Sequence, residues 1–341
     1  TTTKEMIAAV LRTALRTQWT EKNYNNEIGL PVSVLRLKPD CEAAVLEMGM
    51  NHFGELSVLT RIAQPDLAVI TNIGTMHIEN LGSREGILRA KLEILEGLRP
   101  GGRVIFNGDD ALLRPLAARY HAVCFGLSEG CDVRASRVQE TAEDSKFTVH
   151  AFGKSFEAAL SVPGLHNVLD ALAAAAVGLL LGLSPEQIAE GLRSYAPLRQ
   201  RVSHAAGMTI IDDCYNAGPE SMRAALRVLA GTPTEGRRIA VLGGMLELGD
   251  FAPELHAGVG REAAKAADLL LAYGPCSECY VQGAHEAGLA GARAFATHDA
   301  LVAALEETCR AGDTLLFKGS HGMHMEQVLA RFLKTKEHMG E

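Results

Sequence analysis

The sequence predicts an α/β protein built from two domains. Two blocks of short apolar runs alternate with helical patterns, and each run ends near glycine, asparagine or an acidic residue. This alternation is typical of parallel strands joined by crossover helices. Between the two blocks, apolar and polar residues alternate strictly, which indicates an antiparallel meander. We therefore expect mostly parallel sheets with a small antiparallel addition.

The first block contains three expected strands. They are the runs AAVLEMG, DLAVITNIG and GRVIFNGDD, at 43–49, 66–74 and 102–110. Functional side chains of such sheets gather at the carboxyl ends of the strands. We therefore expect Glu47, near the end of the first run, and His77, after the second, to project at the same edge of one parallel sheet.

The middle of the chain changes pattern. Period-two alternation runs from about Asp132 to Val162 and predicts the meander. Two helices are expected next, an alanine-rich one over 167–181 and a second over 185–195. We place a boundary near Pro197 to Gly207, which gives domains of 1–200 and 201–341.

The second block restarts the α/β rhythm after this boundary. Its apolar runs lie in 208–222, 237–245, 268–274 and 313–320, and they predict a smaller, Rossmann-like unit. The turn LGGMLELG at 242–249 is rich in glycine but lacks the G-x-G-x-x-G spacing. A cofactor site is not expected at this turn.

Composition excludes several classes of partner. The chain has 341 residues, 47% of them hydrophobic, and a net charge of −8 with no stripe of Lys and Arg, so no nucleic-acid partner is expected. No apolar stretch reaches the roughly 18 residues of a membrane span, so we expect no membrane insertion. The seven cysteines are scattered, which favours a reducing cytosol. Cys276 and Cys279 form a C-x-x-C without a second pair or a nearby histidine, so a zinc or redox role is not favoured.

The chain opens with TTTKEMIAAVLRT, three threonines followed by an amphipathic helix. Threonine hydroxyls accept hydrogen bonds from the free N–H groups of a helix start, so the cluster is one form of N-cap. It also matches the end of a phosphate-binding loop, G-x-x-x-x-G-K-[ST], whose glycines and lysine would lie before Thr1. The residues alone leave both interpretations open.

Two charged side chains on apolar elements, Lys91 and Glu47, each have two interpretations. Lys91 lies on one helical stripe with Ile87, Ile94 and Leu98, where it either extends its ammonium to water or is desolvated and becomes nucleophilic or modified. Glu47 either caps a helix or holds magnesium, since a carboxylate at a strand end beside a phosphate loop does so in nucleotide enzymes.

Three asparagines occupy four positions in NYNNEIGLP, at 23–31. Asparagine is common in turns because it tolerates left-handed backbone and bonds its own backbone. Amide donors clustered beside a phosphate site would equally suit the oxygens of a phosphoryl group in transfer. The segment is either a plain loop or part of a catalytic site.

Taken together, nine segments in this order resemble the ATP-dependent Mur ligases of bacterial peptidoglycan synthesis. They are TTTKEM, NYNNEIGLP, EMGMNHFGE, TNIGTMHIENLGS, RAKLEI, PGLHNVLDALAAAA, DDCYNAGPESM, LGGMLELG and KGSHGMHME. NYNNEIGLP, NHFGE and DDCYNAGPES favour the member of the family that adds D-alanyl-D-alanine to UDP-N-acetylmuramoyl-tripeptide. The resemblance implies a central P-loop ATPase-like domain over 1–200 and a Rossmann-like C-terminal domain over 201–341.

The resemblance also implies a magnesium centre. Its ligands would be Thr1, Glu47, His77 and Lys91, with Lys91 carbamylated by CO₂ so that a cation becomes an anion. Thr2 would lie close to the phosphates of ATP. Asn25 and Asn26, with Lys91 and His77, would form the catalytic group near the γ-phosphate and the acyl group.

The remaining implied residues bind nucleotide and acceptor. Asn167 would contact the adenine, and Asp213 with Arg201 (or Arg199) would close over the ribose and phosphates. Tyr215, Asn216 and Ser320 would lie at the incoming D-alanyl-D-alanine or at the closing interface.

The implied reaction activates a carboxylate before an amide forms. ATP phosphorylates the terminal carboxylate of the tripeptide, the amine of D-alanyl-D-alanine attacks the acyl phosphate, and phosphate leaves. The partners are then small molecules, and the protein would be a monomer of the bacterial cytoplasm. Another ligase of the superfamily, such as a different Mur ligase or a folylpolyglutamate synthetase, and an inactive ATP-binding fragment are the alternatives.

Two departures from the family pattern produce further expectations. The family carries an N-terminal domain that binds the UDP-sugar, and no segment here resembles it, so we expect the chain to be part of a longer protein. The family also has a strand between the first helix and the N-x-N-N segment, where this sequence has only TQWTEK. We expect either a short loop there or missing residues.

Overall fold

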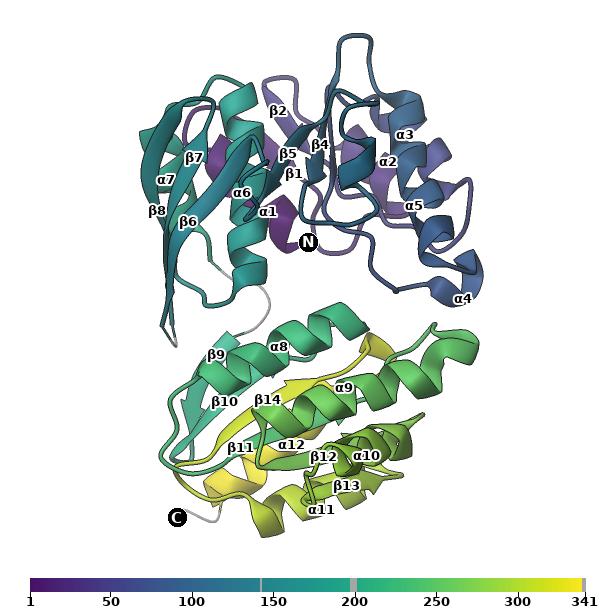
Figure 1. Cartoon of the computed structure of the whole chain (residues 1–341), viewed down its shortest axis with the longest axis vertical. Helices are drawn as coiled ribbons and strands as arrows, with labels where there is room; N and C mark the ends of the chain where they lie inside the picture. The colour runs from purple at the N-terminus through teal and green to yellow at the C-terminus, as the bar shows by residue number, and fades with distance from the viewer. Residues whose placement is uncertain (142, 197–200, 339–341) are drawn as a thin grey trace. The chain divides into compact units, whose positions relative to one another are not determined.

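The computed structural model describes residues 1–341 except 142, 197–200 and 339–341. The chain forms two compact units, Thr1–Ala196 and Pro197–Glu341, each with its own sheet and hydrophobic core (Figure 1). The start of the boundary predicted near Pro197 to Gly207 lies outside the described residues. Within the described part of the chain, no helix combines the length and apolarity needed to cross a membrane.

The main sheet of the first unit has six strands in the order β3-β4-β5-β6-β7-β8. Pairing is parallel from β3 to β6 and antiparallel from β6 to β8, which confirms the predicted α/β class and meander. The strands are β3 (Leu67–Ile70), β4 (Arg103–Asn107), β5 (Val123–Gly126), β6 (Val133–Glu140), β7 (Ser145–Ala151) and β8 (Lys154–Leu160).

A separate two-stranded sheet corrects two expectations. β1 (Thr17–Trp19) pairs in parallel with β2 (Ala43–Val45), so the strand before Glu47 is not part of the sheet that contains β3. The segment TQWTEK also holds a strand rather than only a loop. β2 is short because only Ala43 and Val45 pack against the core, while Ala44 between them is exposed. Glu47 and His77 therefore follow strands of two different sheets.

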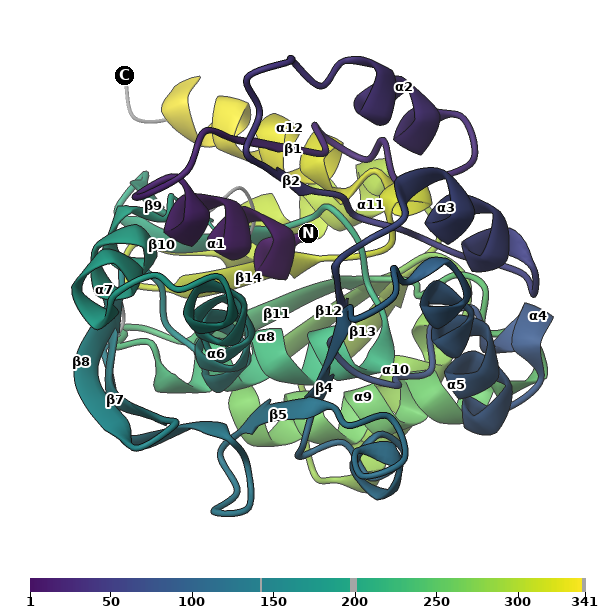
Figure 2. The ribbon, with the colours of Figure 1, turned by 90° about the horizontal axis from the view of Figure 1, so that it is seen from above.

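In the first unit, a glycine allows two helices to pack closely against each other. α1 contacts α6 and α7, and α6 covers the strands from β4 to β7 (Figure 2). Gly191 of α7 allows the approach of α1, since a Cβ there would lie 2.4 Å from the Cα of Val10. The helices are α1 (Thr2–Leu11), α2 (Gly29–Leu35), α3 (Glu55–Ala63), α4 (Ile78–Leu81), α5 (Arg84–Leu92), α6 (Leu165–Leu180) and α7 (Pro185–Ser194).

Helix ends in this unit follow local chemistry. α7 begins with a capping box, in which the Ser184 hydroxyl accepts from the backbone N–H of Gln187 and the Gln187 amide oxygen accepts from that of Ser184. The helical stripe of Ile87, Lys91, Ile94 and Leu98 is divided: α5 ends at Leu92, and a 3₁₀ helix continues over Glu93–Gly97.

The second unit has a six-stranded sheet in the order β13-β12-β11-β14-β10-β9. Pairing is parallel except between β9 and β10. The last strand of the chain, β14, lies between β10 and β11, so the strand order reverses there. The strands are β9 (Arg201–Ala205), β10 (Met208–Asp213), β11 (Arg238–Gly243), β12 (Leu269–Tyr273), β13 (Ala292–Phe295) and β14 (Thr314–Lys318).

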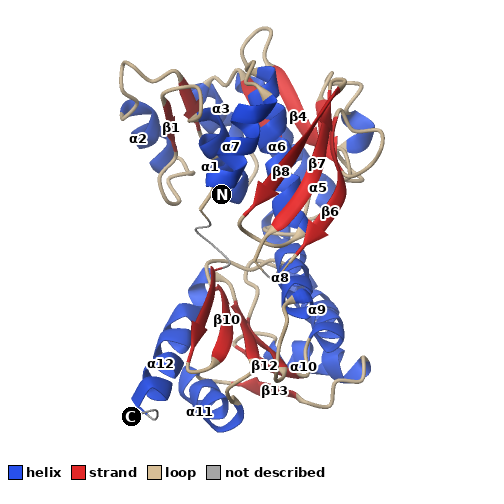
Figure 3. Cartoon of the chain, turned by 90° about the vertical axis from the view of Figure 1, so that its left-hand side faces the viewer, coloured by secondary structure: helices blue, strands red, loops and turns tan. Residues whose placement is uncertain are grey.

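Helices cover both faces of this sheet, with α8, α9 and α10 on one face and α11 and α12 on the other (Figure 3). The strands β11 and β14 are almost wholly buried, as expected of parallel strands covered on both faces. The helices are α8 (Pro219–Gly231), α9 (Ala252–Ala266), α10 (Ser277–Glu286), α11 (His298–Thr308) and α12 (Met325–His338).

Candidate active site

The first unit brings Thr1, Asn25 and Glu47 together. The Thr1 hydroxyl donates to Glu47 Oε1 at 3.0 Å, and Asn25 Nδ2 donates to the same oxygen at 3.2 Å. Thr1 is the N-cap residue of α1, yet its side chain makes no capping hydrogen bond. The hydroxyl is thus used on Glu47 rather than on the helix, which favours the phosphate-loop interpretation of this threonine over a simple cap.

Lys4 completes this cluster, and the sequence analysis missed it. The side chain is buried, and Nζ donates to the carbonyl oxygen of Thr20 at 2.7 Å and lies 3.4 Å from Glu47 Oε2. Thr20 in turn accepts from the backbone N–H of Glu47 through its hydroxyl at 2.9 Å. Lys4 shares a helical stripe with Ile7 and Leu11, a spacing that could have indicated its burial.

The electrostatics of Glu47 favour its ionised form. Burial alone would raise the pKa, but the Lys4 ammonium and hydrogen bonds from Thr1 and Asn25 act to lower the pKa of this carboxyl below its usual value. Oε2 is buried and accepts no hydrogen bond from the described residues. An ionised carboxylate whose buried Oε2 accepts no hydrogen bond from those residues, beside a threonine hydroxyl, is a donor set that suits a hard cation such as Mg²⁺.

Asn26 acts within its own loop. Its Oδ1 accepts from the backbone N–H of Ile28 at 3.2 Å and of Gly29 at 2.8 Å, at the start of α2. The turn interpretation therefore describes the oxygen of Asn26, whereas the amide of Asn25 faces Glu47.

Lys91 and His77 lie around the loop that follows β3. Lys91, half-buried on α5, donates from Nζ to the carbonyl oxygen of Asn72 at 2.7 Å. Arg84, on the same helix, donates twice to the carbonyl oxygen of Ile73, at 3.2 and 2.8 Å. His77 precedes α4 with left-handed backbone (φ 61°). Two cations of α5 thus fix the loop that leads to His77.

Protein side chains alone do not form a complete metal site among the described residues. In the part of the chain that the structure describes, no three His, Cys, Asp or Glu side chains are placed to hold a metal ion. A metal ion at the Thr1–Glu47 pair would therefore need further ligands.

Asn167 and Asp170 lie at the start of α6. Asn167 is buried and donates from Nδ2 to the carbonyl oxygen of Pro163 at 2.6 Å. Asp170 accepts a short hydrogen bond from the Thr3 hydroxyl, which ties α1 to α6.

The second unit gathers its polar residues where the strand order reverses. Asp213 ends β10 and Lys318 ends the neighbouring β14, and their Oδ2 and Nζ atoms lie 2.6 Å apart. Lys318 Nζ also donates to the carbonyl oxygen of Asn216 at 2.9 Å. Only 3% of the Lys318 side chain and 13% of the Asp213 side chain is exposed. Lys318 was not predicted, although a lysine that ends a buried apolar run is a signal of the same kind as Glu47.

Ser320 joins this group through two loops. Its buried hydroxyl donates to the carbonyl oxygen of Ala217 at 3.2 Å and accepts from the backbone N–H of Leu246 at 3.0 Å. The side-chain oxygen of Asn216 accepts from the N–H of Ala217 at 2.8 Å. Tyr215 is 42% exposed, and its ring centre lies 6.0 Å from that of His321. Three of the predicted residues, Asp213, Asn216 and Ser320, thus belong to one polar network.

Arg201 stands on an edge strand. It is exposed on β9, where it lies opposite Asp212 of β10 in the antiparallel register. Arg199, the alternative named for the same role, lies outside the described residues.

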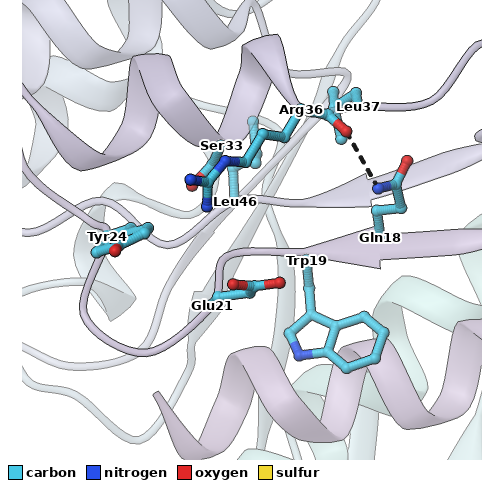
Figure 4. A pocket seen from close by; sticks show the side chains of 8 residues that line it. All are labelled: Gln18, Trp19, Glu21, Tyr24, Ser33, Arg36, Leu37 and Leu46. Carbon is cyan, nitrogen blue, oxygen red and sulfur yellow. Dashed lines mark hydrogen bonds between the residues drawn. The ribbon is translucent and has the colours of Figure 1, made fainter.

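Two other features add nothing to the proposed chemistry of these clusters. All seven cysteines are free thiols, including Cys276 and Cys279 at the start of α10. A pocket of about 40 Å³ lies between β1 and α2, crossed by a hydrogen bond from the Gln18 amide to the carbonyl oxygen of Arg36 (Figure 4). It has room for about one water molecule and none for a nucleotide.

Comparison with known families defines the class to which this fold and these clusters belong. The family model described as the Mur ligase middle domain matches residues 1–178, and that described as Mur ligase, glutamate ligase domain, matches residues 199–321. The chain belongs to the Mur ligase family, as the sequence motifs predicted.

Several individual proteins resemble this chain over nearly its whole length. The UDP-N-acetylmuramoyl-tripeptide–D-alanyl-D-alanine ligase of Bacillus subtilis is 38% identical over 98% of this chain and 74% of its own length. The Escherichia coli enzyme of the same name is 35% identical over 96% of this chain and 74% of its length. Among solved structures, MurF from Acinetobacter baumannii matches with a TM-score of 0.90 and 34% identity, over 98% of this chain and 74% of that one. MurF ligase from Thermotoga maritima, solved with ADP, has a TM-score of 0.88 and 29% identity, over 99% of this chain and 78% of its own.

Proposed function

We propose that this chain forms the ATP-binding and C-terminal parts of a ligase that joins D-alanyl-D-alanine to UDP-N-acetylmuramoyl-tripeptide with hydrolysis of ATP to ADP. The observation that carries the proposal is the agreement over nearly the whole chain with relatives of that name. The enzyme would act as a monomer in the bacterial cytoplasm, on small-molecule substrates.

The first unit would bind the phosphates of ATP at the start of α1. The free N–H groups of a helix N-terminus attract phosphate, and Thr1 and Thr2 stand at this N-terminus as its N-cap and first residue. Magnesium, when bound, would neutralise charge on the oxygens of the transferred phosphoryl group. Thr1 and Oε2 of Glu47 would hold it, with His77 and modified Lys91 as further ligands. Lys4 keeps Glu47 ionised and in place.

Lys91 would carry a carbamate. Its neutral amine would attack CO₂, so that a bond forms between Nζ and carbon and one proton is released to solvent. The resulting anion would be repelled by the Asn72 carbonyl that the ammonium now contacts. The side chain would therefore turn away from Asn72, while Arg84 keeps its hold on the Ile73 carbonyl and preserves the loop before His77.

The second unit would supply the acceptor side of the reaction. Asp213 would bind the ribose or phosphates together with Arg201, and Asn167 of the first unit would contact the adenine. Asn216, Tyr215 and Ser320 would bind the incoming dipeptide, whose amine must be neutral to attack.

The chemistry then follows from what these groups hold. A carboxylate is a poor electrophile, so the tripeptide must first become an acyl phosphate. Asn25, fixed on Glu47, and Asn26, in the adjacent turn, would orient the acyl group and the γ-phosphate by amide hydrogen bonds. Burial of the reacting groups would keep water from the acyl phosphate.

The proposal is tested by phosphate release from ATP in the full-length protein with UDP-N-acetylmuramoyl-tripeptide and a series of amines. Release that requires D-alanyl-D-alanine supports it. Equal release with glutamate would indicate another ligase of the superfamily, such as a folylpolyglutamate synthetase. A protein that binds magnesium–ATP in a titration but releases no phosphate with any amine would be an ATP-binding module without activity. Carbon-13 NMR after addition of labelled bicarbonate tests the carbamate, which should disappear in Lys91→Arg.

A further inference from the structure

We propose that His256 is a positioning residue for the acceptor part of the site, an inference that rests on the proposed function. His256 lies on α9 of the second unit and is fully buried. Nothing in its sequence context, PELHAGVG, distinguishes it from a histidine that fills the core. Its hydrogen bonds, however, distinguish it from a histidine that only fills the core.

Both ring nitrogens are occupied, and their partners fix the tautomer. The backbone N–H of Met245 points to Nε2 at 2.9 Å and can only donate, so Nε2 is the acceptor. Nδ1 lies 2.6 Å from the carbonyl oxygen of Ala252, which can only accept, so Nδ1 carries the hydrogen. The ring is neutral with the proton on Nδ1, in agreement with burial, which lowers the pKa of His256 against the opposing Ala252 hydrogen bond.

Tyr280 fixes Gly243, which lies two residues before Met245. Its ring packs edge-on against His256, with centres 4.6 Å apart, and its hydroxyl donates to the carbonyl oxygen of Gly243 at 3.1 Å. The strand β11 ends at Gly243, so the two side chains fix the chain on both sides of Gly244 as it leaves the sheet.

Leu246, the residue after Met245, contacts Ser320, so the position of this loop determines one hydrogen bond of the Ser320 hydroxyl. The backbone N–H of Leu246 donates to the Ser320 hydroxyl at 3.0 Å, and that hydroxyl gives its only hydrogen to the carbonyl oxygen of Ala217. Ala217 directly follows Asn216, so His256 is connected to the proposed acceptor residues by hydrogen bonds and by the backbone that joins Met245 to Leu246.

Without an acceptor at Nε2, the buried N–H of Met245 would lose its partner. Because an unsatisfied buried N–H is costly, the loop would shift to find another acceptor and would withdraw the N–H of Leu246 from Ser320. A histidine that only filled space would have no such effect on the acceptor site.

Two substitutions separate these roles in the full-length protein. The amide of glutamine reaches the place of Nε2 and can accept from Met245, whereas the shorter amide of asparagine reaches only the place of Nδ1. We expect His256→Asn to raise KM for D-alanyl-D-alanine about tenfold and to leave KM for ATP within about twofold, where tenfold corresponds to about 1.4 kcal/mol. His256→Gln should restore KM for the dipeptide to within about threefold of the wild type.

Equal KM values for the dipeptide in both variants, or an equal rise for ATP and dipeptide, would overturn the inference. Hydrogen exchange at the Leu246 amide gives a second readout, which should quicken about tenfold in His256→Asn only. Should that variant fail to fold, Tyr280→Phe removes a single hydroxyl, and an unchanged KM for the dipeptide there would overturn the proposal. A wild-type protein that does not use D-alanyl-D-alanine refutes the proposed function, whereas an active wild type with indifferent variants refutes only the role of His256.

Discussion

Replacement of Lys318 by methionine should destabilise the second unit strongly. The substitution keeps the length and apolar stem of the side chain but removes the ammonium that pairs with Asp213 at 2.6 Å and donates to the Asn216 carbonyl. A carboxylate that is 13% exposed then stays behind without its counter-charge.

The magnitude follows from the burial of the pair. Removal of one partner of a buried ion pair costs about 3–5 kcal/mol, and partial exposure of Asp213 reduces this to about 2–3 kcal/mol. For a unit of this size, about 3 °C in Tm corresponds to 1 kcal/mol, so Tm should fall by about 6–9 °C. Addition of Asp213→Asn to Lys318→Met should recover about 1–2 kcal/mol, because the stranded charge is removed.

The assay is urea unfolding of the two single variants and the double variant, followed by far-ultraviolet circular dichroism. Tryptophan fluorescence would not report on this unit, because the single tryptophan of the chain, Trp19, lies in the first. Additive losses, with the double variant less stable than Lys318→Met by the full cost of Asp213→Asn, would refute the reasoning.

Three further predictions follow from the same kind of argument. Glu47→Gln should weaken magnesium–ATP binding at least about tenfold in a calorimetric titration, because it removes the anionic oxygen that faces the cation; an equal loss in the presence of EDTA would contradict this. Because burial lowers the pKa of His256 below its ordinary value of 6.5, the unfolded chain takes up a proton near that pH that the folded chain does not bind. The urea midpoint should therefore be highest above pH 6.5 and fall towards pH 5, less steeply in His256→Gln; identical pH profiles would refute the assignment. Gly191→Ala should cost about 1–3 kcal/mol, since its Cβ would lie 2.4 Å from the backbone of Val10, whereas Gly231→Ala, with no atom within 4 Å, should be nearly neutral by thermal unfolding.

Long buried runs and strict alternation were sufficient to predict most of the sheets. The runs that became β10, β11, β12 and β14, and the meander of the first unit, carry enough apolar residues to be recognised without tertiary information. The strands β1, β5, β9 and β13 were missed because they are short, and β9 is mostly exposed at the edge of its sheet.

Candidate residues at strand ends were predictable in kind but not in arrangement. Glu47 stands out as a charge that closes an apolar run, and Asp213 was indicated by the family resemblance. Their partners Lys4 and Lys318 come from distant segments and are recognised only when the chain folds. The expectation that Glu47 and His77 share one sheet edge was wrong because sequence order does not reveal that β2 pairs with β1.

The position of β14 has a consequence for the folding of this protein during its synthesis on the ribosome. The strands β10 and β11 have no hydrogen bonds to each other, because the strand that joins them begins only at Thr314. During synthesis each would present an unpaired edge until the C-terminal segment leaves the exit tunnel, and such edges invite pairing with other chains. The second unit should therefore complete its fold only once β14 has left the exit tunnel, and any delay in releasing this strand should increase aggregation rather than slow the first unit.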